Sequence, residues 1–245
     1  MRRTSLATAL LVLACTGSGE PSQSPSPSYH VLFIGNSLTA VNDLPHTVAA
    51  LGATVEESIV VEAVTRPNLA IIDHINGSSN AMQVLQQGRW DLVVLQQGPT
   101  SQQIGRDTLI LAARMLEPSV AAAGGKIAQL MVWPAAADLS SFDGVLQSCK
   151  DTASAVAGIC LPAGQAWRSA WAIDPSLPFY GPDGFHPSEL GTYLAALVVY
   201  EGITGKSAET LPDQAYVNGR LLSTPANTVR VLQRVAHETV LAYGH

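Results

Sequence analysis

Short apolar segments alternate with longer segments of mixed polarity along most of this chain. The short segments read as β-strands because they are rich in branched apolar residues and are bounded by turn-forming residues. Residues 91–95 (Asp-Leu-Val-Val-Leu) form an almost continuously apolar run, the pattern of a parallel strand buried on both faces. The expected strands are 30–34, 59–64, 91–95, 127–133 and 159–161.

The longer segments between these strands predict helices. Asp43 can cap the first of them, with Pro45 in its first turn, and Gly88 and Gly124 end two others. Alternating strands and helices predict a single α/β domain over residues 29–245, with a mostly parallel sheet of about five strands and helices on both faces. The expected helices are 44–51, 81–87, 108–123, 143–157, 188–201 and 228–243.

The N-terminus has the pattern of an export signal over residues 1–15. Arg2 and Arg3 precede an apolar run at 6–14 that is too short to span a bilayer. The run ends Val12-Leu13-Ala14-Cys15, which resembles the lipobox of bacterial lipoprotein signal peptides and implies lipidation at Cys15. The alternative is a plain secretory peptide that is cut nearby.

Residues 16–28 contain no large apolar side chain and are rich in Ser, Pro and Gly, so they read as a tether. With the signal, they predict an exported protein of the bacterial cell envelope, anchored by lipid at the periplasmic or outer surface. The net charge is only −6, and no basic stripe suggests a nucleic-acid partner. The lipid anchor is the one membrane contact we expect.

Two further cysteines, Cys149 and Cys160, follow in the middle third of the domain. An oxidising compartment would allow a disulfide between them, and two separate buried thiols are the equal alternative. Neither has a Cys or His neighbour at metal-ligand spacing, so no zinc site is expected.

The strand at 30–34 runs directly into Gly35-Asn36-Ser37. A hydroxyl residue immediately after a buried parallel strand lies at the carboxyl edge of the sheet, where ligands bind in open α/β proteins. Ser37 is therefore the candidate nucleophile. The segment lacks the glycine spacing and the Lys of a phosphate-binding loop, which disfavours a flavodoxin-like nucleotide or phosphate binder.

A second chemical signal lies in a Gly/Pro-rich loop that precedes the helix at 188–201, whose N-cap could be Ser188. Asp183 and His186 stand three residues apart there. In such a loop the carboxylate can orient the imidazole while the other ring nitrogen faces a serine. Phe185 would pack inward and anchor the loop; the alternative is a surface turn with an incidental histidine.

Gly35-Asn36-Ser37-Leu38 and Asp183-Gly184-Phe185-His186 resemble the first and last sequence blocks of the SGNH/GDSL hydrolase superfamily. The resemblance covers about residues 29–201 and implies a flavodoxin-like three-layer α/β/α sandwich. It also implies that Ser37 is the nucleophile, His186 the base and Asp183 its orienting acid. Asn36 replaces the Asp of the GDSL form.

The middle blocks depart from the family pattern, as in a divergent branch of the superfamily. The family has a Gly after the second strand whose N–H helps to hold the oxyanion; here residues 64–69 contain none, and Asn68 could donate instead. The family's Gly-x-Asn-Asp after the third strand is replaced by a Leu-Gln-Gln sequence. Gln96 is the first choice for the missing amide donor and Gln97 the second, unless they only satisfy loop backbone groups.

Six other residues have simpler explanations than a role in catalysis. Trp133, at the end of the fourth strand, would either line the acyl or sugar pocket or belong to the core. Asp73 and His74 read as a helix-end or turn pair, and His46 as an exposed helix residue. Trp167 and Trp171 are four residues apart, which on a helix would be one face; a packed stripe is the default and a carbohydrate platform the alternative.

The sequence thus predicts an exported serine esterase of SGNH type. It would hydrolyse an ester, such as an O-acetyl or other short acyl group on a glycan or small molecule, through an acyl-enzyme on Ser37, with no metal or organic cofactor. The substrate class comes from family analogy and location alone. The alternative function is a catalytically silent SGNH-like domain that binds a glycan or a partner.

Overall fold

The computed structural model describes residues 28–244. The export signal, Cys15 and nearly all of the tether lie outside the described residues. Among those that are described, no helix has both the length and the apolar character needed to cross a membrane.

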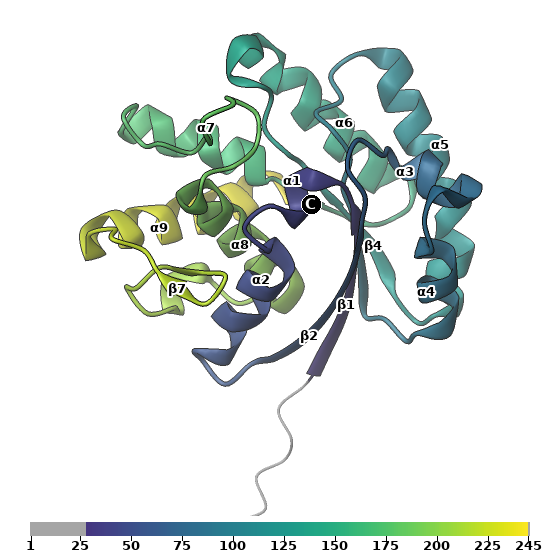
Figure 1. Cartoon of the computed structure of the whole chain (residues 1–245), viewed down its shortest axis with the longest axis horizontal. Helices are drawn as coiled ribbons and strands as arrows, with labels where there is room; N and C mark the ends of the chain where they lie inside the picture. The colour runs from purple at the N-terminus through teal and green to yellow at the C-terminus, as the bar shows by residue number, and fades with distance from the viewer. Residues whose placement is uncertain (1–27, 245) are drawn as a thin grey trace, which may run out of the picture.

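A five-stranded parallel sheet in the order β2-β1-β3-β4-β5 forms the centre of the domain. In register, Phe33 of β1 lies opposite Ala63 of β2 and Val94 of β3. Because all five strands run the same way, their carboxyl ends meet at one edge of the sheet, which lies uppermost in Figure 1. The strands are β1 (Ser28–Gly35), β2 (Ser58–Thr65), β3 (Leu92–Leu95), β4 (Lys126–Leu130) and β5 (Ile159–Leu161).

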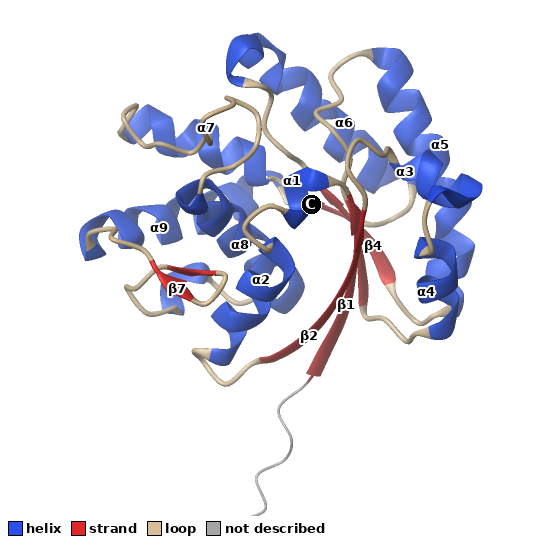
Figure 2. Cartoon of the chain, viewed as in Figure 1, coloured by secondary structure: helices blue, strands red, loops and turns tan. Residues whose placement is uncertain are grey.

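Helices cover both faces of this sheet, as Figure 2 shows. Alternate residues of β1 explain why: Val31 and Phe33 pack into the core beneath α2 and α8, and Leu32 and Ile34 into the core beneath α4 and α5. The predicted three-layer α/β/α fold is therefore confirmed. The helices are α1 (Ser37–Ala40), α2 (Leu44–Ala53), α3 (Ile71–Asp73), α4 (Ala81–Gln87), α5 (Gln103–Ala122), α6 (Phe142–Ala155), α7 (Ala163–Ile173), α8 (Glu189–Thr204) and α9 (Ala226–Tyr243).

Several boundaries differ from those that the sequence predicts. Helix α5 begins at Gln103, five residues before the expected start, and β4 ends at Leu130, three residues before the expected end. The N–H of Met131 still donates to the oxygen of Leu161, but β3 and β5 end at Leu95 and Leu161, so the buried residues 132 and 133 have no strand to pair with. Helix α7 and a small hairpin of β6 (Tyr216–Val217) and β7 (Arg220–Leu221) were not predicted as elements.

Cys149 and Cys160 form a disulfide that ties α6 to β5. Of the two alternatives that the sequence leaves open, the structure has the bonded pair. Both residues are buried, at 2% and 1% exposure.

Candidate active site

Ser37 and His186 meet above the carboxyl edge of the sheet although 149 residues separate them. Ser37 opens the short helix α1 directly after β1, and Asn36 caps that helix by accepting a hydrogen bond from the N–H of Leu38. His186 comes from the loop before α8, and its Nε2 lies 2.9 Å from the Oγ of Ser37. This is the contact that a serine nucleophile and its base require.

Asp183 holds the other side of the imidazole. Its Oδ2 lies 2.6 Å from Nδ1 of His186, and its Oδ1 accepts hydrogen bonds from the backbone N–H groups of Phe185 and His186. These bonds, the one from the imidazole first, lower the pKa of Asp183 to about 2. The carboxylate therefore stays ionised at neutral pH and favours the ring form with the proton on Nδ1, which leaves Nε2 free to accept from Ser37.

The loop that carries this pair is fixed to its surroundings by its backbone. The Nε1–H of Trp133 donates to the oxygen of Phe185, and the Nδ2–H of Asn42 donates to that of Pro187, each at 3.0 Å. The N–H of Ala136 donates to the oxygen of Gly184. Two separate segments of the chain, one at Asn42 and one at residues 133–136, thus hold the loop that carries the imidazole.

Trp133 contacts the site through its hydrogen bond to the oxygen of Phe185 and does not line the cavity beside Ser37. Its side chain is 2% exposed and stacks on Trp167, with ring centroids 3.7 Å apart. It is not among the residues around the cavity beside Ser37. Of the two alternatives for Trp133, the structure therefore favours a core residue over one that lines the pocket.

Gln96 is buried beneath the nucleophile turn and does not face the cavity. Its Oε1 accepts hydrogen bonds from the N–H of Asn36 and the hydroxyl of Thr39, and its Nε2 donates to Oδ1 of Asn36. With 1% exposure, Gln96 has its amide engaged with the turn that carries Ser37. The structure does not support our first choice, Gln96, as the oxyanion donor.

Gly35 makes this arrangement possible, because a Cβ there would lie 2.6 Å from Oε1 of Gln96. No side chain fits between the end of β1 and the Gln96 amide. The glycine that precedes Asn36-Ser37 is thus required by a close approach and not by an unusual backbone angle.

An open cavity lies beside Ser37 on the side of the β2 and β3 loops. Asn68 lines it with a φ of 62°, in the left-handed region that Asn tolerates better than most residues. This is the segment in which the family carries a Gly. The cavity is lined by Asn36, Ser37, Asn68, Leu69, Ala70, Gln97, Gly98, Pro99, Thr100 and Phe185.

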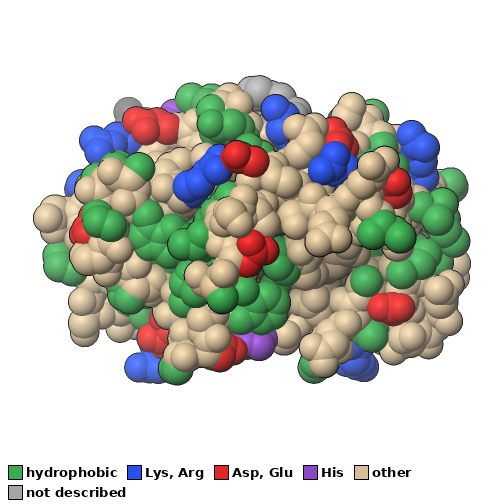
Figure 3. Space-filling view, turned by 90° about the horizontal axis from the view of Figure 1, so that it is seen from above, with side chains coloured by type: hydrophobic (Ala, Val, Ile, Leu, Met, Phe, Trp, Pro, Cys, Tyr) green, Lys and Arg blue, Asp and Glu red, His purple; other side chains and the backbone are tan. Residues whose placement is uncertain are grey.

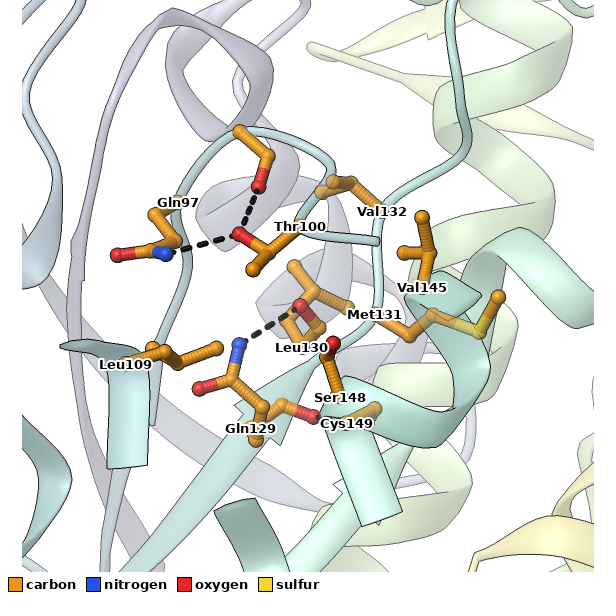
Figure 4. A pocket seen from close by; sticks show the side chains of 11 residues that line it. Gln97, Thr100, Leu109, Gln129, Leu130, Met131, Val132, Val145, Ser148 and Cys149 are labelled. Carbon is orange, nitrogen blue, oxygen red and sulfur yellow. Dashed lines mark hydrogen bonds between the residues drawn. The ribbon is translucent and has the colours of Figure 1, made fainter. Parts of the chain in front are cut away.

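Gln97, unlike Gln96, lines this cavity. Its Oε1 accepts from the N–H of Ile71, and its Nε2 donates to the hydroxyl of Thr100, which in turn donates to the oxygen of Gly98. Figure 4 shows these two bonds of Thr100 at the wall of a second, much smaller cavity of about 10 Å³. A space of that size holds about one water molecule.

Two groups near the site, the half-buried Asn42 and the buried His74, were not assigned a role from the sequence. Asn42 was overlooked, although an Asn-Asp pair before a helix is a signal for the left-handed turn that it forms here (φ 57° and 53°). His74, expected to be a turn residue, is 1% exposed, and its Nε2 lies 3.0 Å from the oxygen of Gly35. His46 is exposed and pairs with Asp43, as the sequence suggests for a surface residue.

Several solved structures of other proteins have a fold similar to that of this chain. No family model matches this sequence, and no curated protein is similar to it. Among solved structures, a protein of the DUF4886 family from Bacteroides uniformis superposes with a TM-score of 0.69 at 16% identity, over 88% of this chain and 95% of its own. A protein from Slackia heliotrinireducens, proposed to be an SGNH hydrolase, gives 0.59 at 24% identity, over 71% and 98%.

The psychrotrophic esterase EstA from a Pseudoalteromonas species, in a structure inhibited by monoethylphosphonate, gives a TM-score of 0.52 at 12% identity, over 71% of this chain and 96% of its own. At these identities the likeness concerns the fold. The chain has the fold of the SGNH/GDSL hydrolases, which is the fold that the resemblance of its first and last sequence blocks implies.

Proposed function

We propose that this protein is a serine ester hydrolase of SGNH type that works through an acyl-enzyme on Ser37. The observation that carries the proposal is the 2.9 Å contact between Oγ of Ser37 and Nε2 of His186, with Asp183 on Nδ1. A nucleophile, a base and an orienting acid in this order are the arrangement for acyl transfer. The shared fold adds support.

In the first half-reaction, Oγ of Ser37 attacks the ester carbonyl carbon while its proton moves to Nε2 of His186. The carbonyl π bond becomes the oxyanion of a tetrahedral intermediate. When this collapses, the bond to the leaving alcohol breaks, and the alcohol takes the proton from Nε2. Water then repeats these steps on the acyl-enzyme: His186 takes its proton, the bond to Oγ breaks, and Ser37 regains its hydrogen as the carboxylic acid leaves.

We assign the oxyanion site to the N–H of Ser37, the N–H of Asn68 and Nε2 of Gln97. The two backbone N–H groups take part in none of the hydrogen bonds that we find within residues 28–244, and the residues that carry them line the cavity together with Gln97. One hydrogen of the Gln97 amide goes to Thr100, and the second is available to a ligand. A donor of this kind lowers the activation barrier by about 3 kcal/mol.

The substrate we propose is an uncharged ester with a short acyl group, such as an O-acetyl group on a glycan or a small molecule. Amide and hydroxyl groups share the cavity with a few apolar side chains, and no charged side chain lines it. Seen from above the carboxyl edge (Figure 3), charged side chains are scattered, several of them beside one of opposite sign, and they form no extended patch of one sign. Such a surface suits a neutral ligand.

Hydrolysis of p-nitrophenyl acetate by the wild type and by Ser37→Ala tests this function. We expect turnover above the uncatalysed rate in the wild type and its loss in the variant. Equal rates for the two would leave a catalytically silent domain that binds a glycan or a partner.

We further propose that the protein is exported and anchored through Cys15. The basic and apolar N-terminal pattern supports export, and the Cys149–Cys160 disulfide is of the kind that persists in oxidising compartments. Labelling with a radioactive fatty acid should mark the wild type and not Cys15→Ala. Export without label would favour the plain secretory alternative.

A further inference from the structure

His74 lies directly behind the turn that presents Ser37. It opens the segment η1 (His74–Ser78), and only 1% of its surface is exposed. Both ring nitrogens are in contact with polar atoms: Nε2 with the backbone oxygen of Gly35 at 3.0 Å, and Nδ1 with Oγ of Ser79 at 2.7 Å.

The partners of His74 fix where its proton sits. A carbonyl oxygen only accepts, so Nε2 must carry the hydrogen that bonds to Gly35. The hydroxyl of Ser79 already accepts from the N–H of Ala81, and its own hydrogen is free to go to Nδ1. Burial lowers the pKa of His74, against smaller opposing contributions from the bond to Gly35 and from Asp73, so the ring is neutral with one proton.

The Gly35 carbonyl belongs to the peptide that leads into Asn36 and Ser37. It also accepts a hydrogen bond from the N–H of Arg66 at 3.0 Å, so His74 fills its remaining acceptor position. On the other side of the same turn, Gln96 holds the N–H and the side chain of Asn36. Hydrogen bonds from His74 and Gln96 thus hold the turn on both sides. Neither residue lines the cavity beside Ser37.

We propose that His74 is a positioning residue for the nucleophile: through the Gly35 carbonyl it holds the turn that sets Oγ of Ser37 at hydrogen-bond distance from His186. This rests on the proposed function and adds to it a residue that acts from outside the catalytic triad. The reason is geometric, because a catalytic group that moves by about 1 Å can lose about 100-fold in rate.

Two substitutions separate the hydrogen bond from mere filling of space. His74→Gln places an amide N–H near the position of Nε2, whereas His74→Leu fills the site without a donor. We expect kcat to fall about 10- to 100-fold in His74→Leu with KM within about twofold of wild type, and to recover most of that loss in His74→Gln. Exposed His30, near the amino end of β1, provides matched controls. His30→Leu and His30→Gln should leave both constants unchanged.

The rate at which a fluorophosphonate modifies Ser37 is measured on the same variants. A wild type that is not modified would refute the proposed function. If the wild type reacts, then equal rates in wild type and His74→Leu, or equal losses in His74→Leu and His74→Gln, would overturn the role of His74 alone.

Should His74→Leu fail to fold, the ring itself can be examined in the wild type. Nitrogen-15 NMR is expected to show a neutral His74 with the proton on Nε2. A proton on Nδ1 would overturn the proposal, since Nε2 could then not donate to Gly35.

Discussion

The indole N–H of Trp133 donates to the backbone oxygen of Phe185, next to the proposed base His186, at 3.0 Å. We expect Trp133→Phe to keep most of the aromatic stack on Trp167 and to lose this bond. The free energy of unfolding should fall by about 1 kcal/mol and kcat by about tenfold, because the loop that carries His186 loses one of its anchors.

Trp171→Phe is the matched control. Its indole N–H also donates to a backbone oxygen, that of Leu177, at 2.9 Å, outside the catalytic loop. Denaturant unfolding and ester turnover of both variants separate the two effects. A similar loss of stability with unchanged kcat is expected for Trp171→Phe, and equal kcat in both variants would contradict the anchoring role of Trp133.

Gln97→Glu tests the proposed oxyanion site. The carboxylate can still accept from the N–H of Ile71, but it has no donor for the oxyanion and brings a negative charge beside it. We expect kcat to fall on the order of 10²–10³-fold with KM little changed. Gln87→Glu makes the same change in charge at an exposed position of α4 and should have no effect. Turnover that survives Gln97→Glu would remove Gln97 from the site.

Asp183 should remain ionised well into the acid range. Its pKa is lowered to about 2 in the folded protein from an ordinary value of 3.8, chiefly by the bond from His186. Its contribution to stability is therefore present above about pH 4 and is lost as the pH falls through 2. Carbon-13 NMR of the Asp side chains should show one carboxylate titrating near pH 2, absent in Asp183→Asn. A midpoint at or above 3.8 would contradict the bonding described here.

Reduction of the Cys149–Cys160 disulfide should destabilise the domain without stopping catalysis. The two residues are 11 positions apart, and a loop of that size corresponds to about 3 kcal/mol in the chain-entropy model. Urea unfolding of the wild type with and without reductant, and of Cys149→Ala/Cys160→Ala, measures this. An unfolding midpoint that does not respond to reductant would show that the bond is absent.

The sequence alone predicts the parallel sheet and the two segments that meet at the site, one with Ser37 and one with Asp183 and His186. Each strand is an apolar run closed by turn residues, and the hydroxyl after the first strand had to lie at the carboxyl edge. The fold that the resemblance implies is the fold that the structure has. Helix α7 was missed because its 11 residues follow β5 after only Pro162, with no clear start signal in the sequence.

The choice between Gln96 and Gln97 could not be made from sequence. Consecutive residues at the end of a strand point to opposite sides, so one amide must turn under Asn36 while the other faces the cavity. Which of the two glutamines lies under Asn36 depends on the register between β1 and β3. It also depends on the space that Gly35, which has no side chain, leaves for the Gln96 amide. Trp133 and His74 depend in the same way on backbone oxygens 52 and 39 residues away along the chain.

Covalent labelling by a fluorophosphonate tests the central claim most directly. The wild type should gain the mass of one phosphonyl group per chain, on the peptide that contains Ser37, and Ser37→Ala should gain none. His186→Ala should react far more slowly, because Oγ then has no base at 2.9 Å. No adduct on the wild type, or an adduct that persists in Ser37→Ala, would contradict the account of Ser37 as the nucleophile.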